Sequence, residues 1–217
     1  MFNRQLSISY SAIRDNHRRG VVGEFLREEI QHGSKLSIVS AYFTIYAFAA
    51  LKDELLHIDS LKFLFGEPQF ILDPSKNEKK WFLIDRDGLK LQNQLQQRPL
   101  AKECADWIKD KVQIKSVRKN NLLHGKMYHI ATEVEETRSD GSKYRESAIM
   151  GSSNFTIKGL GLGSKNSNIE LNLIVKNKES KSDLKVWFDE IWRNEKLVED
   201  VKDKVLLYLC LLYTSPS

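Results

Sequence analysis

The sequence has few cysteines, few prolines and no long apolar run, and these shortages exclude several classes of protein. Its 217 residues include only two cysteines, Cys104 and Cys210, which lie far apart and lack the spacing of a zinc motif. A disulfide framework and a zinc finger are therefore excluded, and a reducing compartment, the cytoplasm, is expected. No window approaches the roughly 18 apolar residues that cross a bilayer, and the first twenty residues lack the apolar core of a secretion signal. We therefore expect no membrane partner.

The residues that are abundant describe a basic globular domain. Hydrophobic residues make up 41% of the chain and charged residues 29%, which is typical of a folded soluble protein. The net charge of +5 favours polyanionic partners. Cations cluster in three expected loops, "IRDNHRRG", "DPSKNEKKW" and "IKSVRKNN". The last loop makes Lys115, Arg118 and Lys119 candidates for nucleic-acid binding, although such charge runs also occur merely to solvate a surface.

The apolar periodicity predicts alternating strands and helices. A strand over residues 35–43, a helix over 44–58 capped by Thr44, and a strand over 60–66 form a βαβ unit, which implies a parallel pair. We therefore predict an α/β fold with a mixed, largely parallel sheet sandwiched between helices. Further helices are expected over residues 21–33, 100–110, 182–195 (capped by Ser182) and 196–212, and further strands over 112–117, 121–131, 148–155 and 169–175.

Two polar segments interrupt this pattern. Residues 68–98 are polar and are expected to cover the rim of the sheet. Residues 132–147 contain Asp140-Gly141, a hairpin turn signal, and are expected to form a surface insertion. One domain is predicted over residues 1–212, and the final residues 213–217 form an atypical tail that suggests a truncation or foreign sequence.

The segment "NLLHGKMYHIA" places a histidine and a lysine in an apolar strand. Strand side chains alternate between faces, so His124 and Lys126 are expected on the same face and His129 on the opposite one. Taken alone, this pattern is also typical of a strand face that meets water. Two further polar groups follow, "GSSN" at residues 151–154 and "NIELN", which contains Glu170.

Together these side chains suit phosphoryl chemistry. Lysine and asparagine bind the nonbridging oxygens of a phosphate and stabilise the charge that grows there. Histidine attacks phosphorus or transfers protons near neutral pH, and a carboxylate on its other nitrogen fixes the tautomer. Asn154 has an alternative role, because asparagine is also a favoured N-cap for a helix starting near Phe155.

The order of "HGK", "GSSN" and a downstream glutamate resembles the signature of the phospholipase D superfamily, written H-x-K-x4-D, G-S-x-N and glutamate. More closely, "VSAYFTIYAF", "LFGEP", "LLHGKMYHI" and "GSSNFTIKGLG" resemble the phospholipase D-like domain at the N-terminus of bacterial Swi/Snf-type helicase-like proteins. The resemblance implies a metal-independent phosphodiesterase that needs no cofactor. It also implies a helicase or ATPase region that follows this domain.

The resemblance assigns a role to each motif residue. It implies that His124 is the nucleophile, that Glu170 orients it, and that Lys126 and Asn154 bind phosphate with Ser152 and Ser153. The mechanism uses two histidines, and this chain has one H-x-K motif, so a homodimer with the site on its two-fold axis is implied.

The sequence departs from the family pattern in two places. Ala131 stands where the pattern has aspartate, and the distance from Lys126 to Gly151 is longer than in compact members. Two hypotheses follow. The first is a nuclease that acts on nucleic acid, with DNA the expected polymer, through a phosphohistidine. The second is a catalytically weak, nuclease-like DNA-binding module that serves a fused motor. A phospholipase proper is a third, less favoured interpretation.

Overall fold

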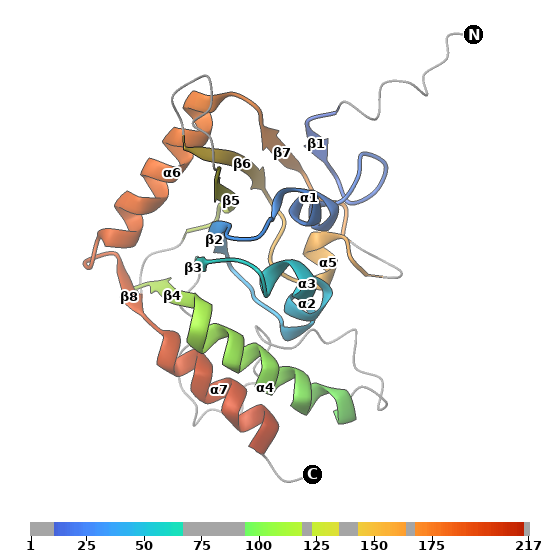
Figure 1. Ribbon diagram of the computed structural model, residues 1–217, viewed down its shortest axis with the longest axis vertical. Coiled ribbons are helices and arrows are strands. Elements are labelled where there is room, and N and C mark those ends of the chain that lie inside the picture. The colour runs from blue at the N-terminus through green and yellow to red at the C-terminus, as the bar shows by residue number, and fades with distance from the viewer. Residues whose placement is uncertain (1–10, 67–93, 119–122, 135–142, 164–167, 215–217) are drawn as a thin grey trace.

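The computed structural model describes residues 11–66, 94–118, 123–134, 143–163 and 168–214, which form one sheet with helices on both faces (Figure 1). In this part of the chain, eight strands pair in the order β1-β7-β6-β5-β2-β3-β4-β8. They are β1 (Ile13–Arg14), β2 (Lys35–Ser40), β3 (Ser60–Phe65), β4 (Val112–Val117), β5 (Lys126–Glu133), β6 (Tyr144–Gly151), β7 (Asn172–Val175) and β8 (Val198–Asp200).

The helices fall into two groups, one on each face of the sheet. α6 packs on one face, where Phe188 and Trp192 join a small apolar cluster with Val39 and Met127. The remaining described helices contribute to the larger core on the opposite face. They are α1 (Val22–Glu29), α2 (Ile45–Ala50), α3 (Lys52–Leu55), α4 (Gln94–Lys111), α5 (Ile157–Leu160) and α7 (Lys202–Thr214), whereas α6 spans Lys178–Arg193.

The sheet is mixed and α/β, as predicted, but the expectation that it is largely parallel is wrong. Only the β2–β3 and β3–β4 pairings are parallel, and the other described pairings are antiparallel. A parallel pair needs a crossover of a dozen or more residues, which α2–α3 and the segment ending in α4 supply. The polar insertion between β5 and β6 is shorter than that, so these strands pair as a hairpin.

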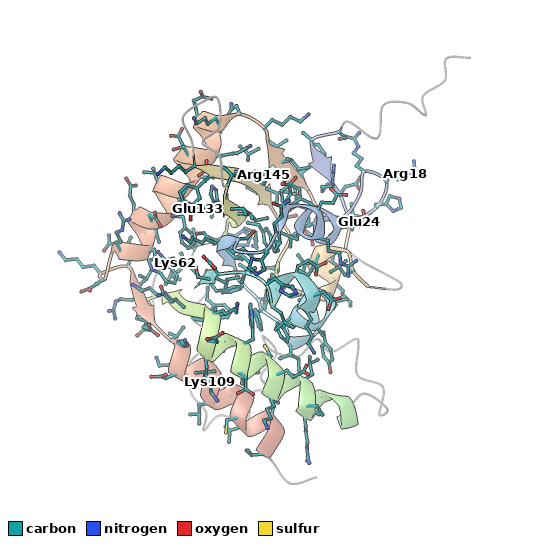
Figure 2. The ribbon with its side chains drawn as sticks, in the orientation of Figure 1. Arg18, Glu24, Lys62, Lys109, Glu133 and Arg145 are labelled. Carbon is teal, nitrogen blue, oxygen red and sulfur yellow. The ribbon has the colours of Figure 1, made fainter. Side chains whose placement is uncertain are left out.

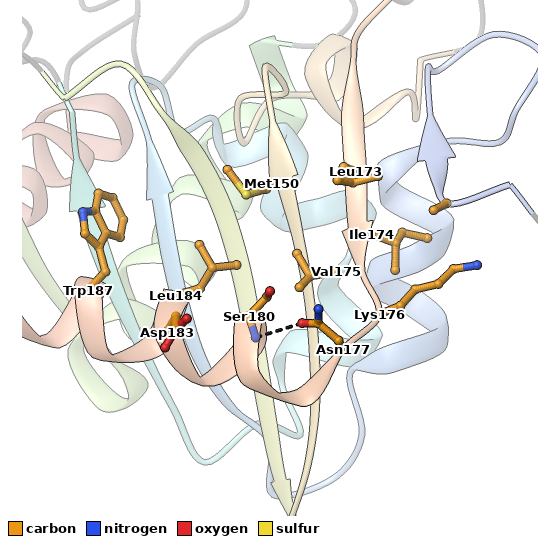
Figure 3. A pocket seen from close by; sticks show the side chains of 11 residues that line it. Met150, Leu173, Ile174, Val175, Lys176, Asn177, Ser180, Asp183, Leu184 and Trp187 are labelled. Carbon is orange, nitrogen blue, oxygen red and sulfur yellow. Dashed lines mark hydrogen bonds between the residues drawn. The ribbon is translucent and has the colours of Figure 1, made fainter.

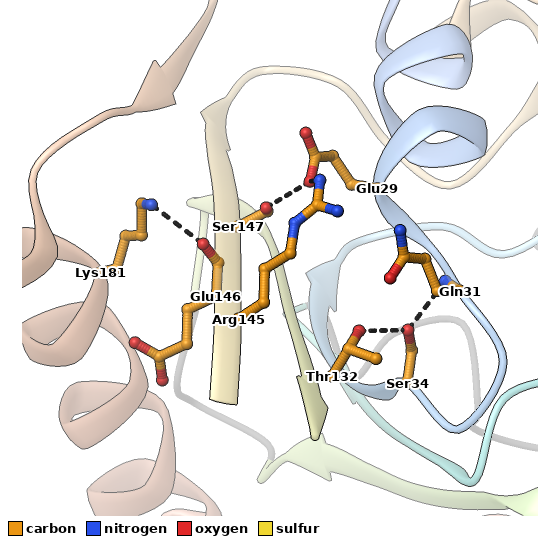
Figure 4. Close-up of polar contacts among 8 residues, drawn as sticks. All are labelled: Glu29, Gln31, Ser34, Thr132, Arg145, Glu146, Ser147 and Lys181. Atoms are coloured by element: carbon orange, nitrogen blue, oxygen red, sulfur yellow. Dashed lines mark hydrogen bonds and ion pairs between the residues drawn. The ribbon is translucent and has the colours of Figure 1, made fainter. Parts of the chain in front are cut away.

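The β5–β6 hairpin is tied to helices on both sides (Figure 4). Arg145 Nη2 and Ser147 Oγ both donate to the carboxylate of Glu29 on α1. On the other face, Lys181 Nζ of α6 donates to the backbone oxygen of Glu146 at 2.9 Å. The expected turn at Asp140-Gly141 lies outside the described residues.

Several element boundaries differ from those predicted. Thr44 caps α2 as expected, because its Oγ1 accepts from Ala47 N at 3.2 Å. The prediction that Ser182 caps the next helix is wrong. α6 begins four residues earlier, and Asn177 Oδ1 accepts from Ser180 N at 2.9 Å. The helix expected over residues 196–212 is partly wrong, since its first residues form β8 at the sheet edge.

Some predictions concern residues that the structure does not describe. Most of the polar segment 68–98 falls there, although α4 already begins at Gln94. The last residues of the tail, 215–217, also lie outside the described residues.

Candidate active site

The predicted site residues gather at one edge of the sheet. The register pairs Lys126 at the start of β5 with Gly151 at the end of β6, and Gly151 with Asn172 at the start of β7. Neighbouring strands lie about 4.8 Å apart, so the three strand ends span about 10 Å. β2 ends at the same edge, because Val39 pairs with Met127. The chain beyond these strand ends therefore carries the predicted site residues. His124 lies just before β5, the GSSN segment begins at the end of β6, and Glu170 lies just before β7.

His124 precedes the strand in which it was predicted to lie. β5 begins at Lys126, and the exposed His124 belongs to the segment that enters it, so the prediction of two side chains on one strand face is wrong. This segment crosses the end of β3, where Leu123 N donates to Gly66 O at 2.9 Å. The crossing moves the chain from β4 to the far side of β2, so the strand cannot extend back to His124.

Lys126 connects His124 to the site. Its side chain is only 6% exposed, and Nζ donates to the backbone oxygen of His124 at 2.8 Å. The ammonium thus fixes the backbone that carries the imidazole, while its charge lies beside the strand ends. A buried cation at this position stabilises an incoming anion more strongly than a cation in bulk water does.

The side chain of Asn154 has a defined orientation. Its Oδ1 accepts from the backbone N of Ala41 at 3.0 Å and from Ser40 Oγ at 3.2 Å. A backbone N–H only donates, so the atom facing Ala41 is the oxygen, and the Nδ2 group points the other way. Within the described residues this Nδ2 makes no hydrogen bond. Thr156, rather than Asn154, caps the following helix, because its Oγ1 accepts from Gly159 N at 2.9 Å.

Ser153 anchors the GSSN loop through buried hydrogen bonds. It is fully buried, its backbone N donates to Asn172 Oδ1 at 3.1 Å, and its Oγ accepts from Asn172 Nδ2 at 2.9 Å. Its carbonyl oxygen accepts from the hydroxyl of Tyr128 at 2.9 Å. These contacts are structural, and a direct contact of Ser153 with phosphate stays a prediction.

Ser152 and Glu170 form a pair at the surface of the site. Ser152 Oγ donates to the Glu170 carboxylate, and it accepts from Leu171 N at 3.0 Å. The second carboxylate oxygen of Glu170 accepts from Asn168 Nδ2 at 3.3 Å. Among the described residues, no hydrogen bond joins Glu170 to the ring of His124. The orienting role of Glu170 therefore stays a prediction, and its observed partners are Ser152 and Asn168.

Two glycines let the backbone segments of the site approach one another. A Cβ at Gly151 would lie 2.1 Å from Leu171 O, and a Cβ at Gly159 would lie 2.3 Å from Asn154 O. Both contacts are with backbone atoms, which do not move aside easily. Gly151 therefore allows β6 to end against the segment of Glu170, and Gly159 allows the Asn154 loop to pack on α5.

Sequence reasoning missed Ser40, Asn172 and Tyr128. Ser40 Oγ accepts from Phe155 N at 2.9 Å, so it holds the GSSN loop at a second point. Burial raises the pKa of Tyr128, and the negative charge of Glu170 raises it further. The available signal was a polar residue at the end of a strand, as in "SIVS" and "IELN", but its partners depend on the register.

The predicted nucleic-acid-binding cations lie elsewhere. β4 is three strands from β5, or about 14 Å away. Lys115 Nζ donates to Trp192 O at 2.9 Å and lies over the ring of Trp192. Arg118 Nε donates to Glu195 O at 2.8 Å. Lys119 is outside the described residues, and the binding role of all three stays a prediction.

His129 lies on the opposite face of the sheet from Lys126, as predicted. Its side chain is fully buried under α6, and neither ring nitrogen has a hydrogen-bond partner among the described residues. Burial, together with the charge of Lys185, lowers the pKa of His129 to about 4. The ring is therefore neutral at pH 7 and contributes to packing.

An exposed strip of apolar side chains borders the site. We call Met150, Ile169, Leu171 and Leu173 the apolar strip; they are 43%, 78%, 66% and 50% exposed. Met150 and Leu173 also line a groove of about 650 Å³ between α6 and the strands β6 and β7, with Trp187 at its other side (Figure 3). The strip thus runs from this groove to the residues on either side of Glu170.

The segments at this sheet edge carry an imidazole, a buried ammonium, a carboxamide and a carboxylate, which are groups that suit phosphoryl chemistry. Over residues 9–192 the chain matches the family model described as "Cardiolipin synthase, PLD-like domain". It therefore belongs to the phospholipase D superfamily, as the motifs indicated, and the family points to an enzyme of the phosphodiesterase type. No curated protein matched the chain.

Two other features are absent from the described residues. No helix among them is long and apolar enough to cross a membrane. In the same residues, no group of three or more histidine, cysteine, aspartate or glutamate side chains is arranged to hold a metal ion.

Proposed function

We propose that the chain is a metal-independent nuclease that hydrolyses phosphodiester bonds of nucleic acid, with DNA the expected polymer, through a phosphohistidine on His124. One observation carries this proposal. His124 is exposed just before β5, the buried Lys126 begins β5, and Asn154 follows the adjacent end of β6, so all three lie at the same sheet edge. A phosphate at this edge is close to a nucleophile and to two donors for its nonbridging oxygens.

The chemistry proceeds in two steps. A ring nitrogen of His124 attacks phosphorus, and the bond to the leaving oxygen breaks as a second imidazole donates a proton to it. The second imidazole, now neutral, then accepts a proton from a water molecule that attacks phosphorus, and the P–N bond to His124 breaks to release the phosphate product. Lys126 and Asn154 stabilise the charge on the nonbridging oxygens in both steps. Ser152 keeps the carboxylate of Glu170 in position through its hydrogen bond.

The second imidazole comes from a second copy of the chain, so we propose a homodimer. Support comes from the position of the apolar strip. Large exposed apolar patches often mark protein–protein contacts, and four exposed apolar side chains lie near Glu170. An isologous contact through such a strip brings two sites together at a two-fold axis.

The alternative is a catalytically weak DNA-binding module. Its support was Ala131, which replaces the aspartate of the family pattern. Ala131 lies five residues along β5 from Lys126, about 17 Å away and on the opposite face. An aspartate there would not reach a phosphate at the site, so Ala131 does not weigh against catalysis.

Nucleic acid is favoured over phospholipid by the basic charge of the chain and its cationic loops. The resemblance to helicase-associated members extends the proposal, with this domain cutting or holding DNA for an ATPase region that follows it.

The proposal is tested with purified chain and labelled oligonucleotides in excess EDTA. We expect cleavage to persist, and His124→Ala to lower it by about a thousandfold or more while DNA affinity stays nearly unchanged. An acid-labile, alkali-stable label on the protein after rapid quenching identifies the phosphohistidine. His57→Ala, an exposed histidine outside the site, is the matched control. Activity that EDTA abolishes and Mg²⁺ restores would rule the mechanism out.

A further inference from the structure

A short loop between β1 and α1 lies directly beside the candidate site. Glu170 N donates to Asp15 O at 3.0 Å, and Asn172 Nδ2 donates to Arg14 O at 3.0 Å. On the other side of the loop, Asn16 Nδ2 donates to Gly159 O at 2.6 Å. Residues 15–20, which we call the Asp15 loop, are thus hydrogen-bonded to the segments that carry Glu170 and Asn154.

The Asp15 loop is held from within by two side chains. Asp15 Oδ1 accepts from the backbone N of both His17 and Arg19 at 2.9 Å, and Asn16 Oδ1 accepts from Val22 N at 3.1 Å. Burial opposes ionisation of Asp15, but these backbone donors outweigh it and lower its pKa. Asn16 adopts φ of 58°, a left-handed conformation that is uncommon outside glycine and often marks functional sites.

This framework presents two arginines to solvent. Arg18 and Arg19 are exposed, and their side chains make no hydrogen bond or ion pair within the described residues. Figure 2 shows Arg18 at the outer margin of the molecule. Arg14, in contrast, binds the backbone oxygens of Ser11, Ile13 and Arg19. The contacts among the described residues give these two adjacent cations no role in packing, and their mutual repulsion opposes folding.

We propose that Arg18 and Arg19 bind phosphates farther along the nucleic-acid strand whose scissile phosphate is held by Lys126 and Asn154, since β1 lies beside β7 and three strands, about 14 Å, from β5. Arginine presents a planar fork that pairs with two phosphate oxygens. A nucleic acid offers a row of phosphates, so a strand held at the site extends past the neighbouring loop. The inference rests on the proposed function and adds residues that position the polymer without taking part in bond cleavage.

The test measures the salt dependence of DNA binding. In a His124→Ala background, which prevents cleavage, Arg18 and Arg19 are both changed to alanine. The logarithm of affinity falls with the logarithm of salt at about 0.9 per phosphate contact on duplex DNA and about 0.7 on a single strand. We expect the slope to decrease by about 1.8 and about 1.4, respectively.

The matched control removes two exposed cations from α4, as Lys102→Ala/Lys109→Ala. Figure 2 shows Lys109 far from Arg18. This variant loses the same formal charge, so it reports the effect of net charge alone. A second readout uses bis(p-nitrophenyl) phosphate, a single phosphodiester, with His124 present. The arginine variant should lower kcat/KM on an oligonucleotide at least tenfold and leave kcat/KM on the small diester unchanged.

The outcomes separate this inference from the proposed function. Suppose that the His124→Ala chain binds DNA but the arginine variant keeps the same salt-dependence slope, or that the α4 variant loses as much of the slope as the arginine variant. Either result overturns this inference and leaves the proposed function standing. If no version binds DNA, the proposed function fails with it. Loss of affinity for phosphatidylglycerol vesicles with an unchanged DNA slope would assign the loop to a lipid surface and overturn the inference as well. Equal unfolding temperatures of the two double variants verify that the fold is intact.

Discussion

At the scale of single residues, the proposed function gives the carboxamide of Asn154 a chemical role beside its structural one. The oxygen receives two donors from the end of β2, while the nitrogen is left for a ligand. A side chain that keeps the oxygen and loses the nitrogen separates the two roles.

Asn154→Asp makes this separation. The carboxylate still accepts from Ala41 N and Ser40 Oγ, so the unfolding temperature should change little. Its second oxygen repels a phosphate where Nδ2 donated, so kcat should fall by about a hundred- to a thousandfold. Asn154→Ala, the control, loses both roles and should also lower the unfolding temperature. A fall in stability of Asn154→Asp that equals that of the alanine variant would contradict this division.

At the scale of elements, α6 packs over the buried His129, whose pKa is lowered by burial. The imidazole faces Glu146 of β6 at 3.8 Å, and Lys181, Lys185 and Asp189 of α6 lie around it. Its pKa is about 4 in the folded chain and about 6.5 when unfolded. Between these values the unfolded chain binds more protons, so this contribution to stability is full above pH 6.5 and is lost as the pH falls toward 4.

The free energy of unfolding should therefore fall by roughly 2 kcal/mol between pH 8 and pH 5 on account of His129 alone. Urea unfolding at both pH values measures it. His129→Leu should remove this part of the pH dependence, whereas His57→Ala, at an exposed site, should retain it. The same pH dependence in both variants would mean that His129 is not the group that titrates.

Elements and site residues were predictable from the sequence to different degrees. Thr44 lies directly before an apolar helical pattern, and its cap was found. Asn177 was missed because the first turn of α6 is polar and exposed, so the apolar pattern begins only near Leu184. The motifs located His124, Lys126, Asn154 and Glu170 at one edge. The supporting roles of Ser40 and Asn172 depend on which strands are neighbours, and a local pattern does not contain that information.

At the scale of the whole molecule, the apolar strip is an apolar surface that the described part of a single chain leaves uncovered. α6 covers the strands β5, β2, β3 and β4 through Phe188 and Trp192, but it leaves Met150 and Leu173 exposed. The strip therefore lies next to the site and outside the core, where a second copy would bury it.

Leu171→Glu tests this arrangement. The backbone groups of Leu171 bond Ser152, and these bonds survive the substitution, so the chain should fold. Two carboxylates facing each other across a two-fold axis repel, so sedimentation should change from dimer to monomer and cleavage should be lost. Leu207→Glu, at an exposed leucine of α7, is the control and should stay dimeric and active. An unaltered chain that sediments as a monomer and cleaves DNA at full rate would be incompatible with a shared site.

The way in which the Asp15 loop is held determines which of its positions tolerate substitution. Its hydrogen bonds come from the side chains of Asp15 and Asn16 and from main-chain groups, and positions 17–19 take part in these bonds only through their backbone. Substitutions at those three positions should therefore change the stability of the fold little. A library randomised at His17, Arg18 and Arg19 offers directed evolution a compact set of positions for changing substrate preference, while the catalytic groups and their scaffold remain constant.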